Sequence, residues 1–361
     1  MDCTTIEELG LDQWSSDLLQ KLGGRRFPLT GMFELTDRCN LGCVHCYINQ
    51  AASCQAAKDS ELSTDEVKHI LDQIAEAGCL NITFSGGEVL IRPDFTEIYL
   101  YARRLGLLVT VFTNATLLTP RIADVFAESR PKKVEVTLYG ATRETYEKVT
   151  GVPGSFDHCM RGIELLLERD IPLNLKSMVL TINLHELPML RSFAEQRGLE
   201  FRYDGNLWPR LDGSSKPYEY RLSIEQMISL DDDNPERQKE WERLSREFSG
   251  SASRAEKVFS CGAGLWSFEI SSTGHMSICG MARRPSFDMR QLGFVEAWQQ
   301  MGELRQMKRV TDNKCRTCTL GALCVQCPGW SQVVHGDNET PVEFLCELAH
   351  MYADRVKKSI I

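Results

Sequence analysis

Three cysteines stand close together near the start of the chain, at Cys39, Cys43 and Cys46. A loop this short can bring three thiolates to one small metal centre. A four-iron cluster normally takes four cysteines, so three leave one iron open to another ligand, as catalytic metals require. The spacing therefore predicts an open iron–sulfur cluster. Zinc with His45 as its fourth ligand, or buried cysteines without a metal, would also fit these residues.

A second group of cysteines forms a spaced array in the last third of the chain: Cys261, Cys279, Cys315, Cys318, Cys324, Cys327 and Cys346. Two C-x2-C pairs often indicate zinc, but zinc ribbons separate their pairs by roughly 15–20 residues. Here five residues separate them, and a proline follows Cys327 as in ferredoxin-type runs. The array therefore favours iron–sulfur clusters over zinc.

A Ser-Gly-Gly-Glu segment at residues 85–88 follows a predicted strand. Gly86 and Gly87 allow the backbone to approach a ligand closely, and the Glu88 carboxylate can accept hydrogen bonds from an ammonium group. Ordinary turns also contain this motif. Its place at the carboxyl end of a strand is where βα barrels keep their active sites.

The elements that would carry these residues alternate between strand-like and helix-like segments. Strands are predicted over residues 32–36, 81–85, 108–113, 133–138, 173–181 and 199–203. Helices are predicted over residues 64–77, 95–105, 120–128, 156–169 and 187–197. This alternation implies parallel βαβ units, and six units cannot close the usual eight-stranded ring. We predict an α/β fold, a partial (β/α)6 barrel followed by a small cysteine-rich α+β auxiliary-cluster domain.

Four parts are expected along the chain. Residues 1–30 form a lead-in with a helix over 6–22, and residues 31–205 form the barrel. Residues 206–255 form a linker with a helix over 241–248. Residues 256–361 form the auxiliary domain, which ends in a helix over 346–358.

Composition narrows the function classes. The net charge of -9 argues against a nucleic-acid-binding role, which needs clustered basic residues. No segment approaches the roughly 20 apolar residues that span a bilayer, and the N-terminus has no signal-peptide pattern. We therefore expect a cytoplasmic protein without a membrane partner. In the cytoplasm the 14 cysteines are expected to bind metal rather than to form disulfides.

The C-x3-C-x2-C loop and the Gly-Gly-Glu segment together resemble the signature of radical SAM enzymes. In that family three cysteines hold a [4Fe-4S] cluster, and its fourth iron binds the amino and carboxylate groups of S-adenosylmethionine (SAM). The resemblance implies that the cofactor contacts are His45, Gly86, Gly87, Glu88, Thr113, Asn114, Thr137 and Lys176. Glu88 would meet the methionine amino group. For the last four residues a purely structural role stays open.

The later cysteines resemble the SPASM extension of radical SAM peptide-maturing enzymes, which holds two auxiliary [4Fe-4S] clusters. The resemblance implies an outer cluster bound by Cys315, Cys318, Cys324 and Cys346. It implies an inner cluster, nearer SAM, bound by Cys261, Cys279 and Cys327. The inner cluster is then one ligand short, so we expect either an open iron that binds substrate or a ligand from elsewhere.

The family resemblance implies cleavage of SAM to a 5′-deoxyadenosyl radical that modifies a ribosomally made peptide. Thioether formation, another cross-link, oxidation or epimerisation are the expected outcomes. A flavodoxin- or ferredoxin-type reductant and a separate leader-binding protein are the expected partners. Gly280 stands where sulfatase-maturating relatives carry an acid, which argues against that activity. The alternatives are an enzyme acting on a small molecule such as a haem-like tetrapyrrole, and a non-enzymatic zinc or interaction module.

Overall fold

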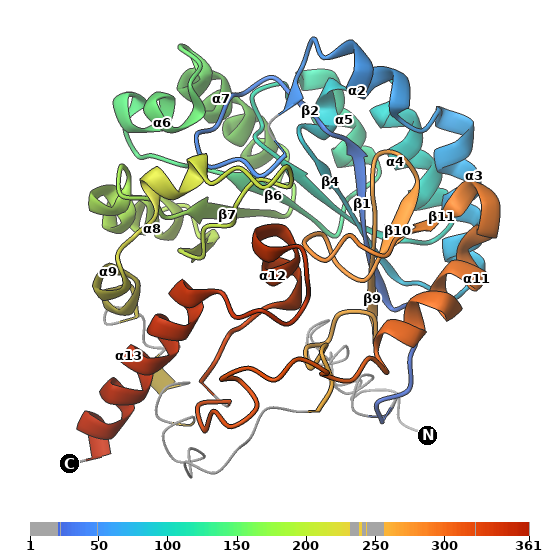
Figure 1. The fold of residues 1–361 in the computed structure, drawn as a ribbon. Coiled ribbons are helices and arrows are strands. Elements are labelled where there is room, and N and C mark those ends of the chain that lie inside the picture. Colours follow the sequence, from blue (N-terminus) through green and yellow to red (C-terminus); the bar gives the residue numbers. More distant parts are fainter. Residues whose placement is uncertain are drawn as a thin grey trace, which may run out of the picture.

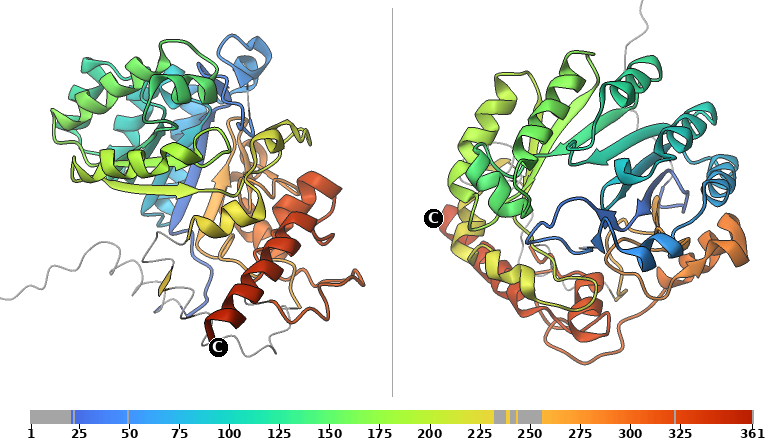
Figure 2. Two further views of the ribbon diagram at one scale, coloured as in Figure 1. Left: turned by 90° about the vertical axis from the view of Figure 1, so that its left-hand side faces the viewer. Right: turned by 90° about the horizontal axis from the view of Figure 1, so that it is seen from above.

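The computed structural model describes residues 21, 23–48, 50–231, 238–239, 243, 256–321 and 323–360. Within these residues, six parallel strands form a curved, open sheet with helices on its outer side (Figures 1 and 2). They are β1 (Thr30–Thr36), β4 (Asn81–Gly86), β5 (Leu108–Thr113), β6 (Lys133–Thr137), β7 (Leu173–Met178) and β8 (Glu200–Asp204). The predicted partial (β/α)6 barrel is therefore confirmed, and each predicted strand overlaps an observed one.

The outer layer of the barrel is formed by helices that alternate with the strands. They are α3 (Thr64–Glu76), α4 (Phe95–Arg104), α5 (Pro120–Glu128), α6 (Arg143–Thr150), α7 (Ser155–Leu167) and α8 (Leu187–Glu195). Helix α3 begins at the predicted capping box, in which Ser63 accepts from the Glu66 amide and Glu66 accepts from the Ser63 amide. Its apolar stripe, which includes Ile70 and Ile74, is buried in the main core.

Helix α6 is the barrel helix that the sequence analysis missed. Its eight residues are mostly polar, so they show little apolar periodicity. Local signals fix its ends instead, because the Thr142 side chain caps the first turn and Gly151 ends the helix with a φ of 71°. This helix matters for the site because its last residues contact the cysteine loop.

The cysteine-rich C-terminal region extends the barrel sheet. Strand β9 (Ser267–Ile270) pairs in parallel with β1, and β10 (His275–Ser277) and β11 (Phe287–Asp288) continue the sheet as antiparallel strands. Gly31 permits this junction, because a Cβ there would lie 2.3 Å from the ring of Phe268. The predicted α+β character of this region is confirmed. Its main-chain pairing with the barrel was not predicted.

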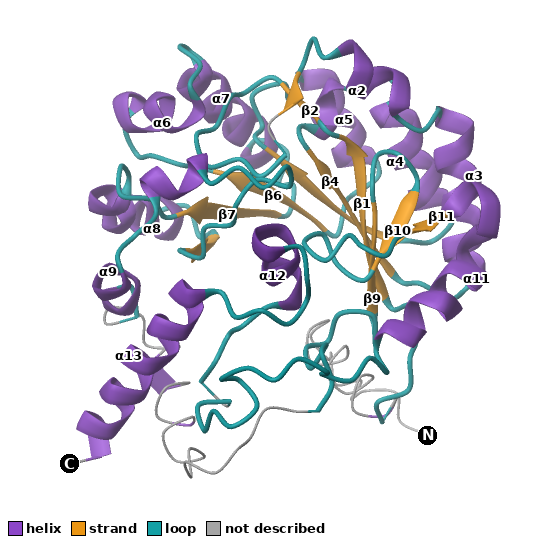
Figure 3. Cartoon of the chain, in the orientation of Figure 1, coloured by secondary structure: helices purple, strands orange, loops and turns teal. Residues whose placement is uncertain are grey.

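Three helices complete the C-terminal region: α11 (Met289–Leu304), α12 (Pro328–His335) and α13 (Glu343–Ile360). Helix α11 lies beside α3, and most of the chain between α11 and α12 is loop (Figure 3). Helix α13 contains the predicted helix over 346–358 and packs on α9 (Ile224–Ser229), in the segment that follows the barrel. The helices predicted over 6–22 and 241–248 fall almost wholly outside the described residues. None of the described helices is long and apolar enough to cross a membrane.

Candidate active site at the carboxyl end of the barrel strands

The first cysteine loop lies directly after β1, between the short paired strands β2 (Arg38–Cys39) and β3 (Gln50–Ala51). Backbone hydrogen bonds tie it to the end of α6, from the Gly42 amide to the Thr150 carbonyl at 2.8 Å and from the Val44 amide to the Val149 carbonyl at 3.0 Å. The structure thus holds the loop in a fixed path across the top of the barrel.

The three thiols of this loop interact electrostatically with one another. Burial raises the pKa of Cys39 to about 12 and the pKa of Cys43 well above its usual value, and neighbouring sulfurs add to both effects. Two donors face one sulfur, since the Leu41 amide lies 3.4 Å and the Asn114 side-chain nitrogen 3.7 Å from Cys39 Sγ. Buried thiols ionise only beside positive charge, and N–H donors to sulfur tune cluster potentials. This donor set fits a buried iron–sulfur cluster.

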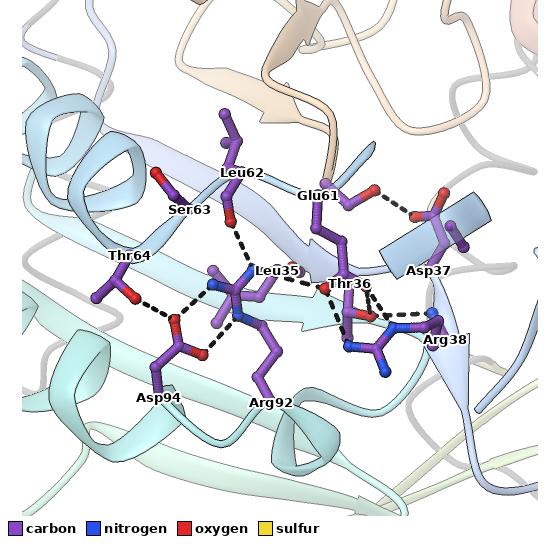
Figure 4. Close-up of polar contacts among 12 residues, drawn as sticks. Leu35, Thr36, Asp37, Arg38, Glu61, Leu62, Ser63, Thr64, Arg92 and Asp94 are labelled. Atoms are coloured by element: carbon purple, nitrogen blue, oxygen red, sulfur yellow. Dashed lines mark hydrogen bonds and ion pairs between the residues drawn. The ribbon is translucent and has the colours of Figure 1, made fainter. Parts of the chain in front are cut away.

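A buried ion pair fixes the residue that precedes the first cysteine (Figure 4). Arg38 donates to both carboxylate oxygens of Glu61, at 2.8 and 3.0 Å, and Thr36 Oγ1 donates to the same carboxylate at 2.5 Å. Both charged side chains are over 90% buried. A bidentate pair of this kind sets orientation as well as charge, so the path of the chain into Cys39 is determined.

A second arginine, Arg92, fixes the same end of β1. Arg92 pairs with Asp94 at 2.6 Å and donates to the carbonyls of Leu35 and Leu62, at 3.0 and 2.9 Å (Figure 4). It therefore links β1 to the start of α3. Ser272, in the turn between β9 and β10, donates to Asp37 at 2.9 Å, so the C-terminal region also contacts the cysteine loop.

A cavity of about 520 Å³ opens beside the loop, at the carboxyl ends of the barrel strands. It brings together ten of the predicted site residues: Cys39, Cys43, His45, Cys46, Gly86, Gly87, Thr113, Asn114, Thr137 and Lys176. These come from five separate segments of the chain. The far wall is formed by β8 and the residues after it, and includes Tyr203 and Trp208.

Glu88 is the predicted cofactor contact that does not line the cavity. Its buried carboxylate accepts hydrogen bonds from Thr113 Oγ1 at 2.7 Å, the Asn114 amide at 2.7 Å and the Leu90 amide at 3.0 Å. Its predicted contact with an ammonium group stays a prediction. Glu88 instead holds the end of β5, where two cavity residues lie.

Gly86 and Gly87, which precede Glu88, lie where there is no room for a side chain. A Cβ on Gly86 would lie 2.1 Å from the Thr36 carbonyl oxygen, and one on Gly87 would lie 2.2 Å from the Arg38 carbonyl oxygen. The Gly87 amide donates to that Thr36 carbonyl at 2.7 Å. The glycines thus let the ends of β1 and β4 approach closely enough for the cavity to form between them.

His45 presents an apolar face to the cavity. Its ring packs edge-on against Tyr139 with 4.7 Å between centroids, and burial lowers its pKa to about 4. Nδ1 is buried without a hydrogen-bond partner. The ring is therefore neutral and suits contact with a cofactor, as predicted, rather than proton transfer.

A cluster of charged residues lies at one wall of the cavity, which Lys176 and Arg202 line. Lys133, Lys176 and Arg202 all pair with Glu135, with the Lys176 ammonium at 3.7 Å. Burial lowers the pKa of Lys176 to about 7, and Glu135 opposes that change. Lys176 Nζ also lies 3.0 Å from the centroid of the Phe112 ring. Lys133 and Arg202 offset the charge of Glu135, and Lys176 is about half protonated at pH 7, so an anionic ligand group here would stabilise its ammonium form.

The structure brings the outer set of later cysteines together, and their binding of a cluster stays a prediction. Cys315, Cys318, Cys324 and Cys346 line one pocket of about 400 Å³. Burial raises the pKa of Cys346, and the neighbouring ammonium of Lys314 opposes that rise. Four thiols and a cation around one space form a donor set that fits a four-iron cluster.

The inner set is more open. Burial raises the pKa of Cys279 to about 11, with a smaller contribution from Cys327, so these two sulfurs lie near each other. Cys279 Sγ accepts from the Ala282 amide at 3.3 Å. Cys261 is exposed in the loop before β9. Among the described residues, no three Cys, His, Asp or Glu side chains converge as on a single metal ion. A four-iron cluster differs from one ion in spreading its thiolates over separate irons.

Sequence reasoning missed a buried charged cluster between the barrel and the C-terminal region. Arg283 donates to both oxygens of Glu34 on β1, at 2.6 and 2.9 Å, and to the Gly280 carbonyl at 2.7 Å. Burial raises the pKa of Glu34, which Arg283 and a hydrogen bond with Tyr47 oppose. Glu269 on β9 is a second buried carboxylate here. The sequence signal for this cluster was a glutamate inside each of two mostly apolar strands, Glu34 in β1 and Glu269 in β9.

Comparison with known proteins identifies relatives of this chain. Residues 33–194 match the Radical SAM superfamily. The chain is 30% identical to the AdoMet-dependent heme synthase of Methanosarcina barkeri over 328 residues, which are 84% of this chain and 92% of that protein. It is 32% identical to the PqqA peptide cyclase of Bradyrhizobium diazoefficiens over 45% of this chain and 42% of that one. The structure of anSMEcpe with bound AdoMet and Cp18Cys peptide has the same fold, with a TM-score of 0.65, 16% identity, and coverage of 92% of this chain and 98% of that one.

Proposed function

The chain belongs to the radical SAM superfamily and is an enzyme, and from this membership we propose that its barrel cavity modifies a ribosomally made peptide. Membership overturns the alternative of a non-enzymatic zinc or interaction module. When bound, SAM and its four-iron cluster supply a 5′-deoxyadenosyl radical that takes a hydrogen atom from carbon. A cytoplasmic location, a flavodoxin- or ferredoxin-type reductant and a separate leader-binding protein stay predictions.

Different residues around the cavity would hold different parts of the cofactor. Cys39, Cys43 and Cys46 would bind three irons, and the backbone at Gly86 and Gly87 would face the methionine end. The ring of His45 offers an apolar surface to the adenosyl group. This assignment is supported by the cavity that these residues share. It is also supported by the hydrogen bonds that Arg38 donates to Glu61 and Thr113 donates to Glu88, which fix the loop and the end of β5.

The polar residues of β5 to β7 would hold the other groups of SAM. Thr113 and Asn114 lie beside the cysteine loop, where they can meet a ribose. Thr137 and Lys176 lie further around the cavity and would bind the methionine carboxylate. The ammonium form of Lys176, which an anionic ligand group would stabilise, supports this assignment.

The residues of the far wall would keep water out of the cavity. Trp208 packs against Trp330 of α12 with 4.4 Å between ring centroids and 33° between ring planes, and Trp330 Nε1 donates to the Tyr218 hydroxyl at 2.9 Å. The C-terminal region thus covers the side of the cavity that an open barrel leaves unprotected. A dry, fixed cavity keeps a carbon radical on its substrate.

The similarity to a peptide-modifying enzyme is the observation that supports the peptide assignment. The PqqA peptide cyclase of Bradyrhizobium diazoefficiens is 32% identical to this chain over 161 residues. The cavity of about 520 Å³ lies within the range of sites that hold one drug-sized ligand.

Two auxiliary clusters are part of the proposal. The shared pocket of Cys315, Cys318, Cys324 and Cys346 supports the outer one. The proximity of Cys279 and Cys327 supports the inner one, to which we also assign Cys261. Their role would be to bind substrate or to carry the electron that leaves the oxidised product.

A haem-like tetrapyrrole is the second candidate substrate. It is favoured by the extent of the similarity to the Methanosarcina heme synthase, which covers 92% of that protein. The similarity to the peptide cyclase covers less than half of either chain. Both candidates would use the same SAM site.

One anaerobic assay separates the candidates. The reconstituted protein is incubated with SAM and dithionite, and either a peptide encoded beside its gene or an iron tetrapyrrole is added. Deoxyadenosine together with a peptide mass loss of about two hydrogens would support the first proposal. A mass change in the tetrapyrrole alone would overturn it in favour of the second. The Cys43→Ala variant serves as the control that should form no deoxyadenosine with either substrate.

A further inference from the structure

A buried carboxylate with one oxygen that accepts no hydrogen bond lies beside the incomplete inner set of cysteines. Glu269 is 7% exposed, and its Oε1 is buried without a hydrogen-bond partner. The neighbouring Arg283 engages both oxygens of Glu34 instead. An unsatisfied buried oxygen of this kind costs free energy, so it calls for a ligand or another role.

Glu269 lies close to the turn that carries Cys279. Glu269 pairs with Ser277 across β9 and β10, and Cys279 lies in the bend that directly follows β10. Glu269 and the Cys279 thiol interact electrostatically. The carboxylate is therefore a neighbour of the thiol.

The glycine after Cys279 makes room for this carboxylate. A Cβ on Gly280 would lie 3.2 Å from Glu269 Oε1 and 3.4 Å from Oε2. The Glu269 side chain therefore fills the position that a side chain at residue 280 would otherwise occupy. It comes within reach of a metal centre held by the Cys279 turn.

We propose that Glu269 supplies the fourth protein ligand of the inner auxiliary cluster, which Cys261, Cys279 and Cys327 leave incomplete. This inference rests on the auxiliary clusters of the proposed function. Glu34 lies on the neighbouring strand but cannot serve, because Arg283 occupies both of its oxygens. Glu269 Oε1 has no such partner and is available to iron.

A carboxylate ligand would make this iron exchangeable. Carboxylate is a hard ligand, and thiolates suit iron–sulfur clusters better. A substrate thiol can therefore replace Glu269, forming an iron–sulfur bond as the iron–oxygen bond breaks. The thiol proton passes to the released carboxylate, and no electron is transferred. The cluster is closed at rest and open to a cysteine-containing substrate.

The test uses protein in which Cys39, Cys43 and Cys46 are replaced by alanine, so that only auxiliary clusters remain. After anaerobic reconstitution it should hold about eight irons per chain. The protein is labelled with carboxyl-¹³C glutamate, reduced and studied by pulsed paramagnetic resonance. A ¹³C coupling is expected from one of two cluster signals. Glu269→Gln should abolish the coupling and lower the 2-mercaptoethanol concentration that shifts this signal by roughly tenfold.

Ser277→Ala is the matched control, since it alters the residue opposite Glu269 without removing a carboxylate. It should keep the coupling. Circular dichroism and an unchanged outer-cluster signal show that each variant is folded. About four irons per chain would mean that the inner cluster is absent, which overturns the auxiliary-cluster proposal and this inference with it. Two clusters with no ¹³C coupling, or with a coupling that survives Glu269→Gln, would overturn the role of Glu269 alone.

Discussion

Arg283 donates to both carboxylate oxygens of Glu34, at 2.6 and 2.9 Å, and so joins the turn after Cys279 to the first barrel strand. The same side chain donates to the Gly280 carbonyl. Because β9 also pairs with β1, the two halves of the molecule share one sheet and one buried ion pair. The relative placement of the SAM cavity and the inner cysteines is therefore built into the fold.

Replacing Arg283 by methionine should destabilise the protein strongly. Two buried carboxylates, Glu34 and Glu269, would lose their cation, and removal of one partner from a buried pair costs about 3–5 kcal/mol. Urea unfolding of the cluster-free protein measures this loss. The matched control is Arg290→Met, which breaks an exposed pair with Glu66 and should cost about 1 kcal/mol or less. Equal effects of the two variants would contradict the structural role of Arg283.

Replacing Glu88 by glutamine should weaken SAM binding without removing the cluster. The carboxylate holds Thr113 and Asn114, and loss of one charge-assisted hydrogen bond is worth about 1.5–3 kcal/mol. We expect the Kd for SAM to rise roughly tenfold or more. Iron content and the signal of the reduced cluster without SAM should stay unchanged. An unaltered Kd would show that the end of β5 does not position the cofactor.

Lys176 should make stability depend on alkaline pH. Burial lowers its pKa to about 7 in the folded protein, against 10.5 when unfolded. Between these values the unfolded chain binds the extra proton, so the free energy of unfolding rises as the pH rises from about 7 towards 10.5. Urea unfolding at pH 7 and pH 9 measures this slope. Lys176→Met should flatten it, and an identical slope in both proteins would refute the prediction.

Cys43→Ala and Cys159→Ala should separate cluster cysteines from packed ones. Both residues are buried, but Cys159 lies in α7 within the core and away from the cavity. Loss of Cys43 should remove about four irons per chain and all deoxyadenosine formation. Loss of the Cys159 sulfur should leave iron content and activity near the original level. The reverse pattern would exclude the assigned cluster loop.

The barrel could be predicted because each strand is a short apolar run between helical patterns, as at residues 108–113. Strand β9 could not, because its place beside β1 depends on the fit of Phe268 over Gly31. Helix α11 was hidden since Gly293 interrupts it. The family resemblance, rather than the cysteine spacing alone, grouped the four outer thiols, which line one pocket. The hydrogen bonds of Glu88 to the end of β5 could not be predicted, because a motif fixes neighbours in sequence but not the direction in which a carboxylate points. The partner-free oxygen of Glu269 is visible only in three dimensions.

The central claim is that Cys39, Cys43 and Cys46 hold a four-iron cluster with one iron open to SAM inside the barrel cavity. The most direct measurement is the paramagnetic resonance spectrum of the reduced protein before and after addition of SAM. We predict that SAM shifts one cluster signal, that Cys43→Ala abolishes this shift, and that deoxyadenosine accumulates on further incubation. Zinc at these cysteines, or a spectrum that SAM leaves unchanged, would contradict the account.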